Sequence, residues 1–265
     1  MKLLELRRPF LSHRLTLFVL ISFLVGTAAW APTLRAEESK PKYGPDAIPL
    51  SVSQSYFKNH FPPLFWKMIP YYVHQQNGWS CGIVSSAIAL NAARAILNLT
   101  PQLKADQPLF YESDLVQYLQ KNQALSKYSG KGVALSELGE ILRETAKDFK
   151  LNQLKIEAVH LDNDSELKAK EKHLHELLMT LEKSDKHLII ANFNQGVYTG
   201  DADVGHYSPV AAYDSANKKV LILDTDRQWY EPYWVSEEVF LKGMKTMDKS
   251  TNKNRGYIHI ELVKQ

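Results

Sequence analysis

The spacing of apolar residues predicts several helices before residue 185. Residues 81–97 are apolar at intervals of three and four, the spacing that places side chains on one helix face. Ser80 or Asn77 is expected to cap the start of this helix. The same spacing predicts further helices near 112–121, 136–149 and 165–184, the last with a charged outer face.

Short runs rich in branched and aromatic residues predict strands in the rest of the chain. They are residues 155–161, 187–193, 208–213, 219–224 and 255–263, each bounded by turn residues. Residues 215–218 are expected to form a hairpin loop, and residues 37–50, with three prolines, an extended arm. Helices followed by antiparallel strands predict an α+β fold, with an N-terminal helical half packed on a C-terminal antiparallel sheet.

The first 36 residues have the order of a secretory signal peptide. Basic residues up to Arg14 precede an apolar run, and small residues follow up to Ala31. Cleavage is predicted after Ala31 or Ala36, which makes residues 37–265 a single exported, periplasmic domain. The alternative is an uncleaved membrane anchor, because the apolar run extends to about 17 residues, the lower limit for a spanning helix.

Charge and composition narrow the function classes. The 265 residues are 45% apolar and 23% charged, which argues against disorder and against several membrane spans. The net charge of +3 suggests an acidic partner, but positions 1–36 hold five of the 32 basic residues and one of the 29 acidic ones, leaving 27 and 28. The near-neutral remainder predicts no nucleic-acid partner and no membrane contact after cleavage. A homodimer stays open.

Cys81 is the only cysteine, so an intramolecular disulfide is excluded. It lies at the predicted start of a helix, where backbone N–H groups and the helix dipole stabilise a thiolate. Six residues earlier, Gln75 is placed to donate to an oxyanion together with the Cys81 backbone N–H. Gly82 is expected to let a substrate approach closely. The alternative is a small, buried and inert thiol.

His206 and Asp224 supply a candidate base and an orienting acid. His206 follows Cys81 by 125 residues, near the separation typical of papain-like enzymes. Asp224 closes the next predicted strand, and the hairpin through residues 215–218 returns its carboxylate beside His206. The remaining histidines are expected to pack or to face solvent. No Cys/His spacing resembles a zinc site, so no metal site is predicted.

Several segments resemble the phytochelatin synthase family, a papain-like group of cysteine transferases. They occur in the family's order and cover roughly residues 45–263: 74–82, 132–139, 205–213, 221–235, 245–248 and 254–257. The resemblance implies a papain-like fold in which Cys81 is the nucleophile, His206 the base and later the acid, and Asp224 the orienting group. It places Gln75 in the oxyanion hole. At the γ-glutamyl end of glutathione, Arg255 fits a carboxylate and Asp248 an ammonium.

The activity implied by this resemblance is that of a glutathione γ-glutamylcysteinyltransferase. Cys81 would cleave the Cys–Gly bond of glutathione and form a γ-glutamylcysteinyl thioester. A second glutathione would take the acyl group to give phytochelatin, or water would take it to give γ-glutamylcysteine. No cofactor is built in, and cadmium or zinc would enter as metal–glutathione thiolates.

The chain departs from the family's pattern at three points, and two of them, the lost arginine and the missing Cys-rich region, favour hydrolysis over transfer. Gln195 stands where the family has an arginine, and Glu231 replaces the first proline of a turn. The Cys-rich C-terminal region of plant members does not follow Arg255. Two alternatives remain: another exported papain-like cysteine peptidase, and a non-catalytic periplasmic binding module.

Overall fold

The computed structural model describes residues 42–99, 110 and 132–263. The predicted signal peptide (1–36) and the predicted helix near 112–121 lie outside the described residues. Within the described part, no helix is both long enough and apolar enough to cross a membrane.

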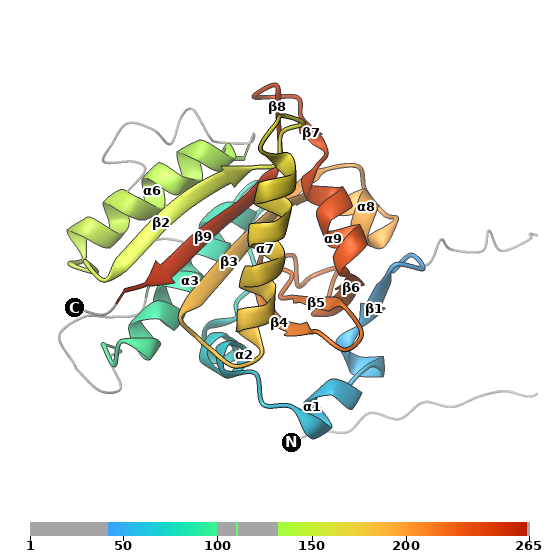
Figure 1. The fold of residues 1–265 in the computed structure, drawn as a ribbon, viewed down its shortest axis with the longest axis horizontal. Helices are drawn as coiled ribbons and strands as arrows, with labels where there is room; N and C mark the ends of the chain where they lie inside the picture. The colour runs from blue at the N-terminus through green and yellow to red at the C-terminus, as the bar shows by residue number, and fades with distance from the viewer. Residues whose placement is uncertain (1–41, 100–109, 111–131, 264–265) are drawn as a thin grey trace, which may run out of the picture. The chain divides into compact units, whose positions relative to one another are not determined.

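A seven-stranded antiparallel sheet forms the centre of the described domain (Figure 1). Its strands follow the order β1-β6-β5-β4-β3-β9-β2. The central strands β3 and β4 are buried along nearly their whole length, which explains the apolar runs at residues 188–191 and 209–213. The bounds of the strands are β1 Ala47–Pro49, β2 Leu154–His160, β3 His187–Asn194, β4 Gly205–Asp214, β5 Lys219–Ile222, β6 Tyr233–Ser236 and β9 Gly256–Leu262.

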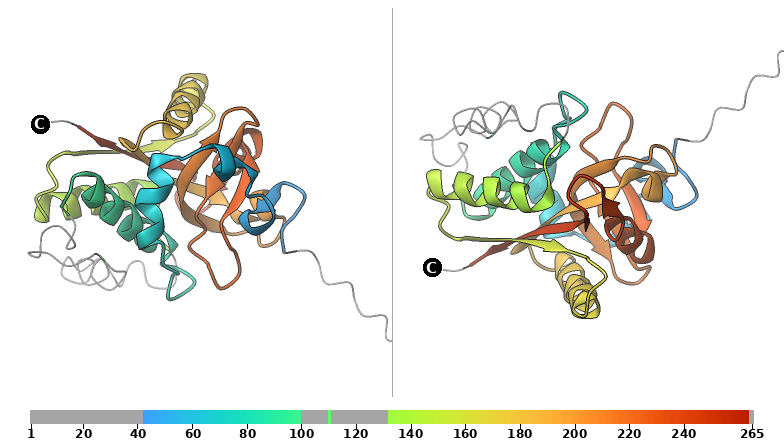
Figure 2. Two further views of the ribbon diagram at one scale, coloured as in Figure 1. Left: turned by 90° about the horizontal axis from the view of Figure 1, so that it is seen from below. Right: turned by 90° about the horizontal axis from the view of Figure 1, so that it is seen from above.

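Helices cover both faces of this sheet. Helices α3 and α6 lie on one face and α7 on the opposite face (Figure 2). Fourteen of the 16 residues of α3 are buried, so this helix is a core element and fixes the position of Cys81 at its first turn. The bounds are α1 Ser55–Asn59, α2 Pro63–Met68, α3 Cys81–Ile96, α6 Leu135–Asp148, α7 Leu167–Leu181, α8 Gln195–Thr199 and α9 Glu237–Met244, with 3₁₀ turns at Leu50–Val52 and Ile69–Tyr71.

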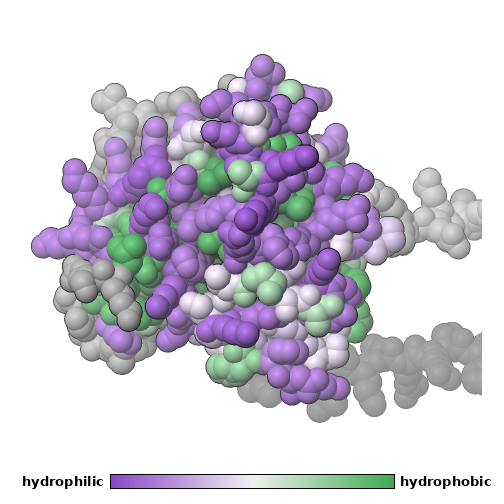
Figure 3. Space-filling model, viewed as in Figure 1, coloured by the Kyte–Doolittle hydropathy of each residue, from purple (hydrophilic) through white to green (hydrophobic). Residues whose placement is uncertain are grey.

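Helix α7 has a buried apolar face and a polar outer face, as its sequence pattern predicts. Its leucines at 174, 177, 178 and 181 are buried against the sheet. Figure 3 shows that the face of the molecule carrying α7 is largely hydrophilic. A separate two-stranded sheet, β7 (Met247–Asp248) and β8 (Lys253–Asn254), precedes β9.

The predicted α+β fold is confirmed, with two local corrections. Residues 47–49 of the expected arm form β1, which pairs with β6 at the edge of the sheet. Ser80 occupies the N-cap position of α3 as predicted, but its side chain forms no capping hydrogen bond. Its hydroxyl instead donates to the Asn77 carbonyl at 3.4 Å, and the Asn77 side chain accepts the Trp79 N–H at 3.1 Å.

Candidate active site

The Cys81 thiol lies at the first turn of α3, with 7% of the residue exposed. Helix α3 packs directly on β4, where the Ser85 hydroxyl donates to the Tyr207 carbonyl at 3.1 Å. Gly82 makes this close packing possible, since a Cβ there would lie 3.2 Å from the Leu138 side chain and 3.3 Å from the Tyr207 ring. The structure therefore gives Gly82 a packing role against Leu138 and Tyr207.

His206 is the second residue of β4, and Asp224 follows the end of β5. Strands β4 and β5 pair from Asp214 and Lys219 at the hairpin to Val210 and Ile222. The two chains stay together beyond this ladder, because the Leu223 N–H donates to the Pro209 carbonyl at 2.9 Å. Asp224 Oδ1 then lies 2.8 Å from His206 Nε2. The hairpin brings the two side chains together as the sequence predicts.

The Asp224 carboxylate is completely buried and receives further donors. Oδ1 accepts the Asp226 backbone N–H at 2.9 Å. Oδ2 accepts the Tyr233 hydroxyl at 2.9 Å and the Gln195 amide nitrogen at 3.3 Å. Burying a charge is costly unless it is paired and hydrogen-bonded, and these contacts meet that condition.

The buried pair favours the charged state of both groups. Burial alone would lower the pKa of His206, but the charge of Asp224 and hydrogen bonds to Asp224 and Cys81 raise it well above its ordinary value. Burial alone would raise the pKa of Asp224, but the charge of His206 and the hydrogen bonds around the carboxylate lower it. His206 therefore holds a proton between an acid on one side and Cys81 on the other.

Gln75 is buried and anchored to the residue that follows the acid. Its backbone N–H donates to the Thr225 carbonyl at 2.9 Å, and its amide oxygen accepts the Thr225 hydroxyl at 3.2 Å. Because the amide oxygen is engaged there, the amide nitrogen is the end that can donate to a bound group.

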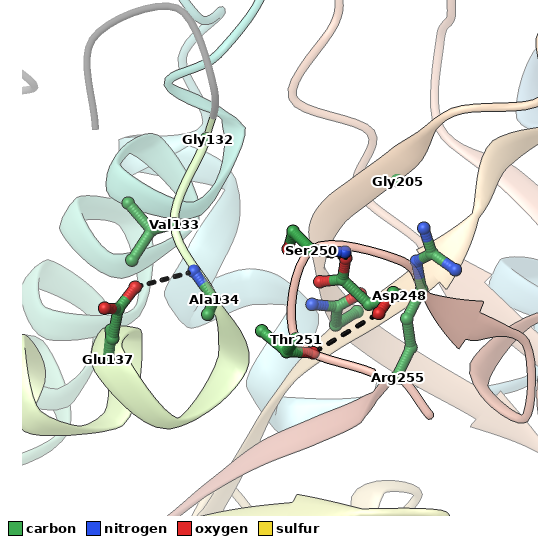
Figure 4. A pocket seen from close by; sticks show the side chains of 10 residues that line it. Gly132, Val133, Ala134, Glu137, Gly205, Asp248, Ser250, Thr251 and Arg255 are labelled. Carbon is green, nitrogen blue, oxygen red and sulfur yellow. Dashed lines mark hydrogen bonds between the residues drawn. The ribbon is translucent and has the colours of Figure 1, made fainter. Parts of the chain in front are cut away.

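A cavity of about 380 Å³ contains both predicted substrate-binding residues, Asp248 and Arg255. Figure 4 shows Glu137 and Ala134 on one wall and Asp248 with Arg255 on the facing wall. Tyr207 lies beside this cavity. Its hydroxyl donates to the carbonyl of Val133, a residue of the cavity wall, at 2.9 Å. Burial and the charges of Cys81 and Asp248 raise the pKa of Tyr207 well above its ordinary value.

The Arg255 side chain is held in place at the cavity wall. Its Nη1 donates to the Thr246 hydroxyl at 3.0 Å and to the Met247 carbonyl at 2.6 Å. Its guanidinium lies against Gly205, where a Cβ would be 3.0 Å from Nη2. Gly205 therefore makes room for the arginine beside His206. A fixed guanidinium suits a planar carboxylate, which it can bind through two parallel hydrogen bonds.

A family model described as phytochelatin synthase matches residues 50–257. The chain belongs to the phytochelatin synthase family. Cys81, His206, Asp224, Asp248 and Arg255 all lie within the matched range. The matched range covers most of the 265 residues.

The curated proteins similar to this chain share one name, glutathione gamma-glutamylcysteinyltransferase. Glutathione gamma-glutamylcysteinyltransferase 3 of Lotus japonicus is 27% identical over 202 residues, 76% of this chain and 38% of the relative. Glutathione gamma-glutamylcysteinyltransferase 1 of Arabidopsis thaliana is 24% identical over 196 residues, 74% of this chain and 36% of the relative. The Schizosaccharomyces pombe enzyme is 40% identical over 63 residues, 24% and 14% of the two chains. The chain spans less than two fifths of the length of these relatives.

The structure adds site residues that the sequence analysis did not assign. Tyr233 and Gln195 hold Asp224, and the Tyr72 hydroxyl donates to the Asp224 carbonyl at 2.5 Å. Glu137 joins the wall of the Arg255 cavity. Glu137 and Tyr233 lie in segments that resemble the family, and Gln195 replaces an arginine of the family pattern, but none of these signals indicated a contact with Asp224 or with the cavity. In the described part of the chain, no group of three or more His, Cys, Asp or Glu side chains is arranged to hold a metal ion.

Proposed function

We propose that this family member is a cysteine-dependent glutathione γ-glutamylcysteinyltransferase that can also pass its acyl group to water. One observation carries the proposal: buried His206 is hydrogen-bonded to Asp224 on one side and to Cys81 on the other, next to the Arg255 cavity. A cysteine paired with a histidine that an acid orients is the arrangement of a nucleophilic acyl-transfer site.

The first half-reaction forms a thioester. The Cys81 thiolate attacks the carbonyl carbon of the cysteinyl residue of glutathione. The S–C bond forms, the C–N bond to glycine breaks, and protonated His206 gives its proton to the departing nitrogen. The Cys81 backbone N–H and the Gln75 amide nitrogen stabilise the oxyanion. Arg255 and Asp248 hold the γ-glutamyl carboxylate and ammonium.

The second half-reaction releases the acyl group. His206 takes a proton from the acceptor as its oxygen or nitrogen attacks the thioester carbon, and the S–C bond breaks to restore the thiolate. Water gives γ-glutamylcysteine, and a second glutathione gives phytochelatin. We expect hydrolysis to dominate, because Gln195 supplies no positive charge where the family pattern has an arginine. Cadmium or zinc enters only as a thiolate complex of the glutathione substrate.

One incubation tests both the chemistry and the product ratio. The purified chain and a Cys81→Ala control are mixed with glutathione, with and without cadmium or zinc, and the products are identified by mass spectrometry. We expect glycine and γ-glutamylcysteine from the wild type and none from the control. Phytochelatin as the main product under all metal conditions would contradict the preference for water.

Alkylation distinguishes an enzyme from a binding module with an inert thiol. Because His206 keeps its proton beside Cys81, we expect iodoacetamide to modify Cys81 much faster than free glutathione at pH 6. An equal or lower rate would remove the support for a catalytic thiol.

The Arg255→Ala variant distinguishes the rival papain-like peptidase. Loss of glutathione turnover together with retained cleavage of unrelated peptides would favour that alternative. The exported location is part of the proposal, and release of the protein with the periplasmic fraction tests it. Gel filtration coupled to light scattering decides between monomer and homodimer.

A further inference from the structure

A second cavity of about 410 Å³ borders His206 and lies apart from the Arg255 cavity. Its lining includes Lys42, His206, Asp226 and Trp229, and the two cavities share no lining residue in the described part of the chain. Gly205 lines the first cavity and His206 lines the second. Successive residues of a strand point to opposite faces, so the two cavities flank the start of β4.

Lys42 lines this second cavity together with two carboxylates, Asp201 and Asp226. Its ammonium lies 2.6 Å from Asp201 and over the rings of Trp229 and Tyr230, at 4.6 and 4.3 Å from their centroids. Tyr230 donates to the same Asp201 oxygen at 2.7 Å, which holds this carboxylate in place. An ammonium has three N–H donors, and the contacts with Asp201 and with the Tyr230 hydroxyl use two of them, which leaves one for a ligand.

The chemistry of the two half-reactions requires a site on this side of His206. This step rests on the proposed function. The acyl group extends from Cys81 into the Arg255 cavity, so the leaving glycine extends away from it, with its nitrogen at His206. By microscopic reversibility, an acceptor amine attacks along the path by which glycine left. Glycine and an acceptor glutathione share one feature, an amine nitrogen with a carboxylate on the adjacent carbon.

We propose that the second cavity binds the leaving glycine and the incoming acceptor, and that Lys42 pairs with their carboxylate. The amine nitrogen faces His206, and the Asp226 carboxylate lies in the same cavity as a counter-charge for an ammonium. In the forward step the C–N bond breaks and the nitrogen takes the His206 proton. In the transfer step the acceptor nitrogen bonds to the acyl carbon, sulfur leaves, and His206 takes a proton back. Lys42 exchanges no proton and acts through charge.

The test compares glutathione with its glycyl amide. The amide lacks the glycine carboxylate but keeps the Cys–Gly bond that is cleaved. The rate measured is release of glycine or glycinamide, as kcat/KM, from the full chain. Since a charge-assisted hydrogen bond is lost with the amide, we expect the wild type to favour glutathione by about 10-fold to 100-fold. The preference should fall to about 1 in Lys42→Met and persist in Lys42→Arg. Lys58→Met, an exposed lysine of α1, is the matched control and should keep the wild-type preference.

The preference is the ratio of two kcat/KM values measured on the same enzyme preparation. A fraction of unfolded protein lowers both values equally and leaves their ratio unchanged. Equal rates for the two substrates in the wild type, or an unchanged preference in Lys42→Met, would overturn the assignment of Lys42 and leave the proposed function standing. No release from either substrate by the wild type would contradict the proposed function itself, and this assignment with it.

Discussion

At the scale of single residues, the Asp224 carboxylate organises the site. Among the described residues, His206, Asp226, Tyr233 and Gln195 donate to its two oxygens. These donors keep the acid ionised and direct His206 Nε2 toward it. The other ring nitrogen, Nδ1, then serves Cys81. The acid therefore sets both the charge and the orientation of the imidazole.

Replacing Asp224 by Asn should slow glycine release and move its pH profile. The negative charge of Asp224 raises the pKa of His206, so its removal lowers that pKa. Because the reactive state needs a protonated His206, the alkaline limb of the kcat/KM profile should shift to lower pH. We expect a loss of about 100-fold or more at neutral pH. An unshifted alkaline limb would show that another group sets it.

Tyr233→Phe removes one neutral donor from the same carboxylate. The change leaves the ring in place and the other contacts of Asp224 intact, so the cost is that of one hydrogen bond, about 1 kcal/mol. We expect kcat/KM for glycine release to fall by about 3-fold to 10-fold. A loss as large as that of Asp224→Asn would mean that the hydroxyl does more than hold the acid.

Sequence alone predicts only part of this constellation. The hairpin at residues 215–218 joins neighbouring strands, so counting along it places Asp224 beside His206. Tyr72 reaches Asp224 from a segment 152 positions earlier in the chain, and no local pattern indicates that approach. Lys42 meets Asp201 across 159 positions for the same reason. Spacing along the chain predicts contacts between two strands joined by a short loop. Contacts between distant segments depend on tertiary packing, which no local pattern predicts.

At the scale of elements, β2 and β9 pair so closely at one point that only glycine fits. A Cβ on Gly256 would lie 1.9 Å from the Val159 carbonyl oxygen, which belongs to the backbone and cannot move aside alone. Gly256 also follows Arg255 directly, so this pairing fixes the start of β9 next to the Arg255 cavity.

Gly256→Ala should therefore separate the two strands and destabilise the fold. We expect the free energy of unfolding, measured by urea titration, to fall by at least about 3 kcal/mol. Gly78→Ala is the matched control, because a Cβ at Gly78 meets nothing within 4 Å. Similar stabilities of the two variants would contradict the close approach at Gly256.

Apart from α9, which has eight residues, the elements that sequence analysis missed have six residues or fewer. β1 has three residues and β6 has four, too few for an alternating apolar pattern to be distinguished from chance. The longer helices α3, α6 and α7 repeat their apolar spacing over several turns, and their prediction is confirmed within about three residues at each end.

At the scale of the whole molecule, a histidine pair makes the stability depend on pH. His187 Nδ1 and His259 Nε2 lie 3.0 Å apart, and the His173 ring is 6.0 Å from His259. Burial lowers the pKa of His259 to about 4, with further lowering by His187, His173 and Lys155. The folded state therefore binds a proton at this site less readily than the unfolded state does.

Acid should weaken the fold through this pair. A folded-state pKa below the unfolded value of about 6.5 gives stability above pH 6.5 that is lost as the pH falls toward 4. His259→Gln removes the titrating group. The drop in unfolding free energy between pH 7 and pH 5 should be smaller in this variant by about 1–2 kcal/mol. Identical drops in the two proteins would exclude His259 as the source.

Both edges of the large sheet are completed late in the chain. β1 pairs with β6 near residue 235, and β2 pairs with β9 between residues 256 and 262. A chain that emerges from its N-terminus first must hold β1 and β2 without partners until these segments arrive. Contacts of such long sequence separation slow folding and make it depend on nearly the full length. The sheet edge that follows Lys42 and the strand that starts beside Arg255 therefore both depend on pairing with segments distant in the sequence.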